Sequence, residues 1–125
     1  MKRIYAIIFY SILSICALAQ GWPTNYGGVM LQGFYWDSYT DTKWTNLESQ
    51  ADELSQYFSL IWVPQSGYCN TTSNVMGYMP VYYFNQNSSF GTQAELKSMI
   101  KTFNDKGLGT IADVVVNHRN NLGIN

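Results

Sequence analysis

Runs of apolar residues along the chain predict three buried strands, at residues 29–34, 60–63 and 108–116. Each run is short and nearly continuous in hydrophobic side chains, which fits strands that are covered on both faces. The second run stops at Pro64, because proline cannot donate a hydrogen bond to a neighbouring strand. The pattern therefore predicts three separate strands.

Two segments between these runs have the periodicity of amphipathic helices. Apolar residues recur at intervals of three and four over residues 44–58 and again over residues 96–103. Pairs with the capping-box spacing, and a glycine that follows a lysine, mark the expected helix ends. These residues are Thr45 with Glu48, Thr92 with Glu95, and Gly107.

The order strand, helix, strand, helix, strand predicts an α/β fold with parallel strands, because each helix is long enough for a right-handed crossover. Residues 65–91 show no clear period, so we expect a long loop there. The pattern fits a doubly wound sheet or an eight-fold barrel, and both bind ligands at the carboxyl ends of the strands. A nucleotide-binding fold is disfavoured, because bulky aromatic residues replace a glycine-rich phosphate loop at residues 34–36. No second domain is expected.

The first 19 residues have the pattern of a secretory signal peptide. Lys2 and Arg3 precede a mostly apolar run over residues 4–18, which ends in small residues at Ala19. A membrane-spanning helix needs about 20 apolar residues, and this run is shorter and leads into a polar segment. We therefore expect cleavage after Ala19, a secreted product spanning residues 20–125, and no stable membrane anchor.

Removal of the signal peptide leaves 106 residues with five basic and eight acidic side chains. This net negative charge is not the pattern of a nucleic-acid-binding protein. Cys69 is then the one remaining cysteine, so no internal disulfide is expected, and we interpret it as an ordinary loop thiol. No feature of the sequence predicts a protein partner.

The expected carboxyl ends of the strands carry flat aromatic side chains beside an amide and an imidazole. Sugar rings suit such a surface, because their C–H faces stack on aromatic rings while their hydroxyl groups need hydrogen-bond donors and acceptors. The residues concerned are Trp36, Tyr78, Met79, Tyr82, Asn117 and His118.

Four segments resemble a known family. DVVVNH at residues 113–118 resembles the first signature region of the α-amylase family of glycoside hydrolases. LQGFYWDSY at residues 31–39, GYMP at residues 77–80 and FGTQAELKSMI at residues 90–100 resemble the same family in order and approximate spacing. The resemblance implies that residues 20–125 form the first three β/α units of a TIM (β/α)8 barrel, an incomplete amino-terminal part of the catalytic domain.

The resemblance also implies roles for single residues. Asn117 would supply one oxygen to a structural Ca2+ ion, which needs about six to eight oxygen ligands, so the other ligands are expected outside this chain. His118 would hydrogen-bond hydroxyl groups of the sugar at the cleavage subsite, and Tyr78 would stack on the same ring. Met79 and Trp36 would line neighbouring subsites. Without the resemblance, the asparagine would be interpreted as a turn cap and the lone histidine as a structural residue.

The family hydrolyses internal α-1,4-glucosidic bonds of starch-like polysaccharides with retention, using an aspartate nucleophile and a glutamate acid/base about 5 to 5.5 Å apart. These residues follow the fourth and fifth strands of the family, and a further aspartate follows the seventh, so none is expected in this chain. Asp113 is interpreted as a buried structural residue inside the third strand, which holds nearby loops through hydrogen bonds. The chain alone is expected to be inactive. The alternative is a secreted non-catalytic carbohydrate-binding or inactive amylase-like protein.

Overall fold

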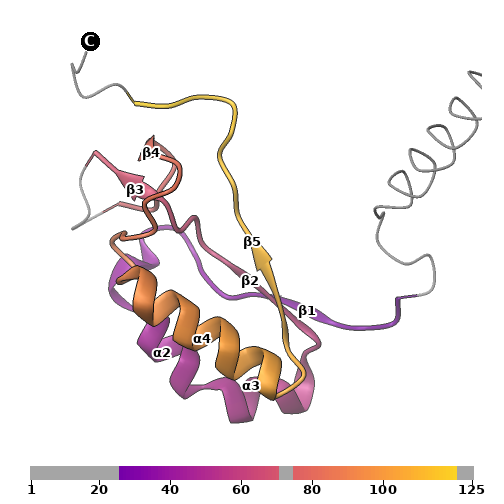
Figure 1. The fold of residues 1–125 in the computed structure, drawn as a ribbon. Helices are drawn as coiled ribbons and strands as arrows, with labels where there is room; N and C mark the ends of the chain where they lie inside the picture. Colours follow the sequence, from indigo (N-terminus) through magenta and orange to yellow (C-terminus); the bar gives the residue numbers. More distant parts are fainter. Residues whose placement is uncertain (1–25, 71–74, 121–125) are drawn as a thin grey trace, which may run out of the picture.

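A sheet of three parallel strands organises the chain (Figure 1). The computed structural model describes residues 26–70 and 75–120, so the predicted signal peptide lies outside the described residues. The strands are β1 (Met30–Gln32), β2 (Leu60–Val63) and β5 (Gly109–Ala112), and they lie in the order β1-β2-β5. This arrangement confirms the predicted α/β pattern of parallel strands.

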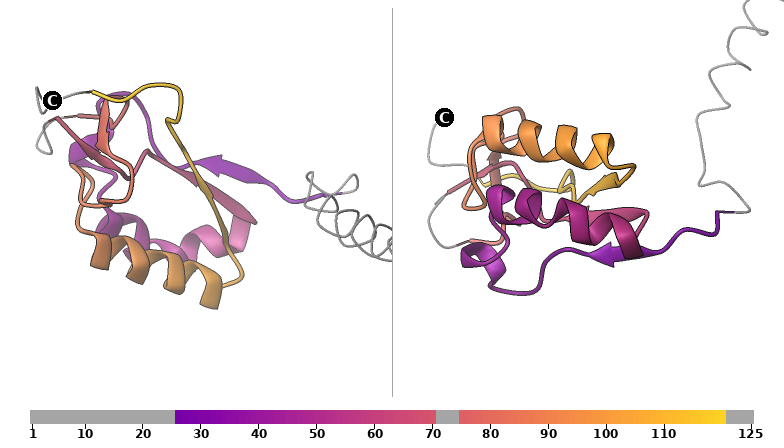
Figure 2. Two further views of the ribbon diagram at one scale, coloured as in Figure 1. Left: turned by 45° about the horizontal axis from the view of Figure 1, so that its top comes forward. Right: turned by 90° about the horizontal axis from the view of Figure 1, so that it is seen from below.

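The helices lie side by side on one face of this sheet (Figures 1 and 2). Helices α2 (Trp44–Ser49) and α3 (Ala51–Tyr57) connect β1 to β2, and α4 (Gln93–Asp105) precedes β5. A short 3-10 helix, η1 (Ser38–Thr40), follows β1. The predicted single helix over residues 44–58 is divided at Gln50, whose φ of −92° and ψ of 1° are not helical. None of these described helices is long and apolar enough to cross a membrane.

Both ends of α4 match the sequence prediction. The Glu95 amide donates to the Thr92 hydroxyl at 3.3 Å, and the Thr92 amide donates to the Glu95 carboxylate at 2.7 Å. At the other end Gly107 has a φ of 77°, and the Leu108 amide donates to the Phe103 carbonyl at 2.9 Å. The helix therefore begins with a capping box and ends with a Schellman-type turn.

The capping box predicted for the first helix is wrong. The N-cap of α2 is Lys43, which makes no side-chain cap, so Thr45 lies inside the helix. Glu48 instead accepts hydrogen bonds from Ser98 at 2.8 Å and from Thr102 at 2.7 Å, both on α4. This carboxylate joins α2 to α4, two helices that are far apart in the sequence. A spacing rule that applies within one helix cannot predict such a contact.

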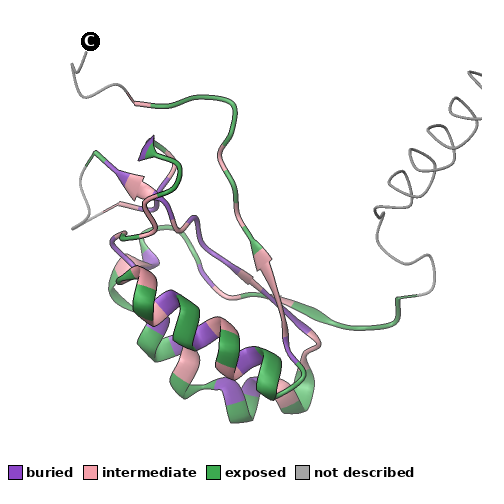
Figure 3. Cartoon of the chain, viewed as in Figure 1, coloured by how far each residue is buried: buried purple, intermediate pink, exposed green. Residues whose placement is uncertain are grey.

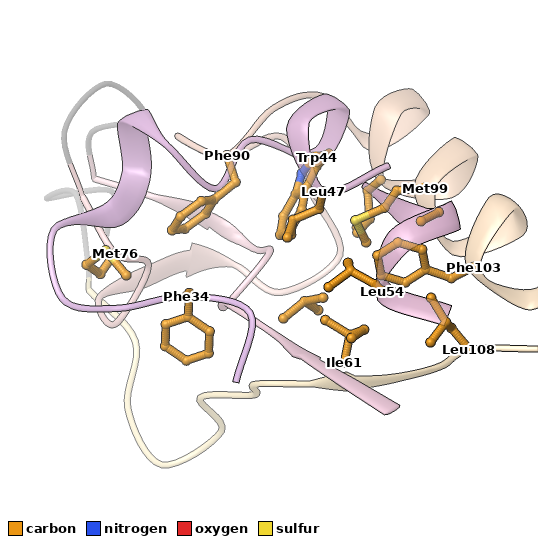
Figure 4. Packing of buried hydrophobic residues seen from close by; sticks show 13 residues of the cluster. Phe34, Trp44, Leu47, Leu54, Ile61, Met76, Phe90, Met99, Phe103 and Leu108 are labelled. Carbon is orange, nitrogen blue, oxygen red and sulfur yellow. The ribbon is translucent and has the colours of Figure 1, made fainter. Parts of the chain in front are cut away.

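The core lies between the sheet and the helices (Figure 4). The inward faces of the helices are buried and their outward faces are exposed (Figure 3), as the apolar periodicity predicts. Burying one large apolar side chain contributes roughly 1.5–3 kcal/mol, so this layer is the main source of stability for the described residues. Its largest fully buried members include Trp44, Ile61, Phe90, Met99, Phe103 and Leu108.

The outer strands are shorter and more exposed than the sequence predicts. Met30 in β1 is 49% exposed, so this strand is not buried on both faces within the described residues. Strand β5 ends at Ala112, although apolar residues continue to Val116. The cause is the neighbouring strand: β2 ends at Val63, and Pro64, which follows it, has no amide hydrogen with which to pair further residues.

A small hairpin lies within the segment that was predicted to be a long loop. Strand β3 (Tyr68–Cys69) pairs antiparallel with β4 (Pro80–Tyr82), and the rings of Tyr68 and Tyr82 lie 5.6 Å apart. Cys69 is therefore a buried strand residue and not a loop thiol. Burial raises the pKa of its thiol, which keeps it protonated at neutral pH.

Candidate functional site

Three segments that follow the parallel strands meet at the edge of the sheet formed by the carboxyl ends of these strands. They are residues 33–41 after β1, residues 64–70 and 75–91 after β2, and residues 113–120 after β5. In Figure 1 the β3–β4 hairpin and the chain beyond β5 both lie at the end of the molecule to which the three strands point. Ligands of α/β proteins bind at this edge.

Tyr78 occupies the centre of this region. Its hydroxyl donates to the carboxylate of Asp113 at 3.1 Å, so the GYMP segment is bonded to the end of β5. Burial and, after it, the neighbouring charge of Asp113 raise the pKa of the Tyr78 phenol. The phenol therefore keeps its proton well into the alkaline range and remains a hydrogen-bond donor.

His118 lies against the same tyrosine. Its Nε2 atom is 2.8 Å from the carbonyl oxygen of Tyr78, and because a carbonyl can only accept, Nε2 carries the proton. The carbonyl of His118 in turn accepts a hydrogen bond from the Tyr83 hydroxyl at 3.2 Å. In the neutral ring Nδ1 is then left as an acceptor. The exposed imidazole is thus oriented by its bond to the carbonyl of Tyr78, while the bond from Tyr83 holds the backbone of His118.

Trp36 and Met79 complete the predicted set of sugar contacts. The ring of Trp36 lies parallel to that of Tyr78, with a centroid separation of 5.9 Å and an interplanar angle of 4°. Trp36 is 71% exposed and Met79 is 52% exposed, so both present apolar surface to solvent. They line a cavity of about 260 Å3 together with Asp37, Cys69, Asn70, Val75, Met76, Gly77 and Tyr78.

The amide of Asn117 lies next to these residues and is exposed. Its Nδ2 atom is 3.5 Å from Nδ1 of His118, which leaves the side-chain oxygen for another partner. An amide oxygen is a suitable ligand for a hard cation such as calcium, but one oxygen does not make a site. Among the described residues no group of three or more histidine, cysteine, aspartate or glutamate side chains gathers as a metal site.

Asp113 does not lie where the sequence predicts. It follows the last residue of β5 instead of lying inside the strand, and its amide donates to the carbonyl of Val63 at 3.3 Å. Its side chain is partly exposed and not buried. The predicted task of holding a neighbouring loop is nevertheless consistent with its bond to Tyr78.

Sequence reasoning missed two contacts that fasten the hairpin to the segment after β5. One is the bond from Tyr83, and the other joins the amide of Asn120 to the carbonyl of Pro80 at 2.8 Å. Tyr83 lies among several tyrosines in a segment without periodicity, so nothing in the sequence distinguishes it. The structure thus brings all predicted site residues to one edge, while their roles stay predictions.

The chain is similar in sequence to known α-amylases. No protein-family model matches the chain. Over 93 residues it is 37% identical to the chloroplastic alpha-amylase 3 of Arabidopsis thaliana, covering 73% of the chain and 10% of the relative. Over 132 residues it is 25% identical to an α-amylase of Bacillus licheniformis, covering 94% of the chain and 26% of the relative.

A solved structure shows the same fold. The crystal structure of α-amylase I from Eisenia fetida matches with a TM-score of 0.62 and 24% identity, over 74% of this chain and 18% of that one. The fold is therefore that of part of a TIM barrel. More narrowly, the chain belongs to the α-amylase family of glycoside hydrolases. It spans between 10% and 26% of the length of the curated relatives named above.

Proposed function

We propose that the protein containing this chain hydrolyses internal α-1,4-glucosidic bonds of starch-like polysaccharides with retention of configuration. In this proposal residues 20–125 form the first three β/α units of the catalytic barrel. They supply part of the substrate-binding face, and the catalytic carboxylates come from outside the chain. The observation that carries the proposal is the pair of parallel rings of Trp36 and Tyr78 beside His118, within a chain of the α-amylase family.

The contacts support binding of a glucose ring at this face. The exposed face of Trp36 suits the C–H surface of a sugar, and Tyr78 and Met79 extend the same apolar area. His118 would accept a sugar hydroxyl proton at Nδ1 in place of its 3.5 Å contact with the Asn117 amide, because Nε2 is engaged by the carbonyl of Tyr78. Aromatic stacking with a few fixed polar groups is the pattern of small-ligand sites.

Two further expectations belong to this proposal. Asn117 would supply one oxygen ligand to a structural calcium ion, with the remaining ligands contributed by residues outside this chain. Such an ion would fix the segment that carries the neighbouring imidazole. The protein would be exported by means of the signal peptide expected at residues 1–19, and would act on an α-glucan polysaccharide or oligosaccharide.

The reaction can be tested with the purified full-length protein and maltoheptaose, with anomeric protons followed by NMR. We expect shorter maltooligosaccharides whose new reducing ends appear first as the α-anomer, because a retaining mechanism preserves the configuration of the cleaved bond. Cellohexaose, which has β-1,4 bonds, serves as the control and should remain intact.

The other outcomes have distinct meanings. Products that appear first as the β-anomer would contradict retention. Binding of maltoheptaose without cleavage would favour the alternative of a non-catalytic carbohydrate-binding protein. The absence of both binding and cleavage would refute the proposed function altogether.

A further inference from the structure

The bond between Tyr78 and Asp113 joins two segments of the chain that lie 35 residues apart. Asp113 stands at the tip of β5, where its own amide is bonded to Val63 of the neighbouring strand. The aspartate is thus attached to the sheet through its backbone. Its side chain reaches from this rigid position to the loop that carries the aromatic residues.

Three contacts hold Tyr78, and each contact constrains a different part of the residue. Its carbonyl accepts a hydrogen bond from His118 at 2.8 Å, which fixes the backbone. One face of its ring lies against the parallel ring of Trp36. The hydroxyl bond to Asp113 is the directional contact at the far end of the ring. Stacking alone permits sliding and rotation of a ring in its plane, so this hydroxyl bond determines its orientation.

We propose that Asp113 is a positioning residue for glucan binding, which holds the ring of Tyr78 parallel to Trp36 so that both rings meet the sugar as one rigid surface. The inference rests on the proposed function, and it assigns to the aspartate no contact with the sugar itself. A surface that is ordered before binding costs less conformational entropy when the ligand arrives. Loss of the bond should therefore weaken glucan binding although the ring remains.

The carboxylate is well suited to this task. A hydrogen bond from a neutral phenol to a charged carboxylate is stronger than one between two neutral groups. The titratable groups near the phenol are Asp113 and His118, which are in contact with the tyrosine, and Asp37 and Cys69, which line the same cavity. Of these, Asp113 is the one bonded to the hydroxyl.

A double-mutant cycle in the full-length protein tests the inference. Tyr78→Phe and Asp113→Asn each alter one end of the bond, and the double variant alters both. The probe is an α-1,4 maltooligosaccharide with sulfur in place of the glycosidic oxygens, so that binding is measured without cleavage. We expect each single change to weaken binding about fivefold, and the double change to weaken it by no more than the larger single effect.

Two measurements separate positioning from a general loss of structure. Tyr57→Phe removes an exposed hydroxyl on α3 and should leave binding unchanged. Carbon-13 labelling of the tyrosine rings reports the titration of Tyr78, whose pKa should fall toward its ordinary value in Asp113→Asn because the neighbouring negative charge is gone. If Asp113→Asn does not fold, Tyr78→Phe alone tests the bond, since it keeps the ring.

The outcomes distinguish this inference from the function on which it rests. If the wild-type protein does not bind the probe, the proposed function fails and the inference fails with it. If the wild type binds but Tyr78→Phe binds equally well, the inference alone is overturned. Single effects that multiply in the double variant would also overturn it, because they would show that the two side chains act independently.

Discussion

At the scale of single residues, Gly77 determines where Tyr78 can lie. Its φ is +99°, a value that side-chain-bearing residues rarely adopt. A Cβ atom at this position would lie 2.8 Å from the carbonyl oxygen of Gln65, which is backbone and cannot easily move. The glycine of the GYMP motif thus allows the chain to pass closely over the end of β2.

Gly77→Ala should therefore destabilise the full-length protein by about 1–2 kcal/mol and weaken its binding of maltooligosaccharides. The reason is that the added methyl group meets the backbone of Gln65 in a strained conformation. Urea unfolding and calorimetric titration measure the two effects. Gly27→Ala is the matched control, since no atom lies within 4 Å of a Cβ there and its φ is not positive. Equal behaviour of the two variants would contradict this account of Gly77.

The candidate site was predictable from the sequence only where single residues carry the signal. The motif DVVVNH and the segment GYMP identified Asn117, His118 and Tyr78, and the strand order placed them at one edge. The bonds that connect them were not predictable, because the partners of Tyr78 and Tyr83 lie 35 residues away in each case. Local sequence patterns indicate the periodicity of a helix or strand. They do not indicate which side chains from distant parts of the sequence form a hydrogen bond.

At the scale of elements, the sequence predicted the existence of helices and strands better than their ends. Apolar periodicity gave the correct inward faces of α2, α3 and α4, because burial of that face is what stabilises a helix. The end of β5 was missed because it depends on the length of β2, where Pro64 ends the pairing. The β3–β4 hairpin was missed because strands of two and three residues are too short to show alternation.

The two capping-box spacings provide a test at this scale. Thr92→Ala should destabilise the full-length protein by about 1 kcal/mol, because the amide at the start of α4 loses its partner. Thr45→Ala should be neutral or slightly stabilising, because Thr45 is exposed inside α2 and alanine favours the helix. Chemical unfolding measures the free energy of unfolding of both variants and tests these two predictions. An equal loss of stability would show that Thr45 is a cap after all.

At the scale of the whole molecule, the helices cover one face of the sheet and the candidate substrate-binding segments lie at the carboxyl ends of its strands (Figures 1 and 2). Among the described residues no helix covers the opposite face of the sheet (Figure 2), and Met30 in β1 is 49% exposed. In the described sheet, each of the outer strands, β1 and β5, pairs with one neighbouring strand. This is the arrangement expected if further strands of a barrel pair with both edges and enclose the open face.

The central claim is that the rings of Trp36 and Tyr78 form a surface that binds α-1,4-glucan. The most direct test is the dissociation constant of the sulfur-linked maltooligosaccharide for the full-length protein, measured by calorimetry for the wild type, Trp36→Ala and Tyr57→Ala. Trp36 and Tyr57 are both exposed aromatic residues, but Tyr57 lies on α3, away from the edge. We predict that Trp36→Ala weakens binding at least about tenfold, or about 1.4 kcal/mol, and that Tyr57→Ala leaves it unchanged. Wild-type affinity in Trp36→Ala would contradict the claim.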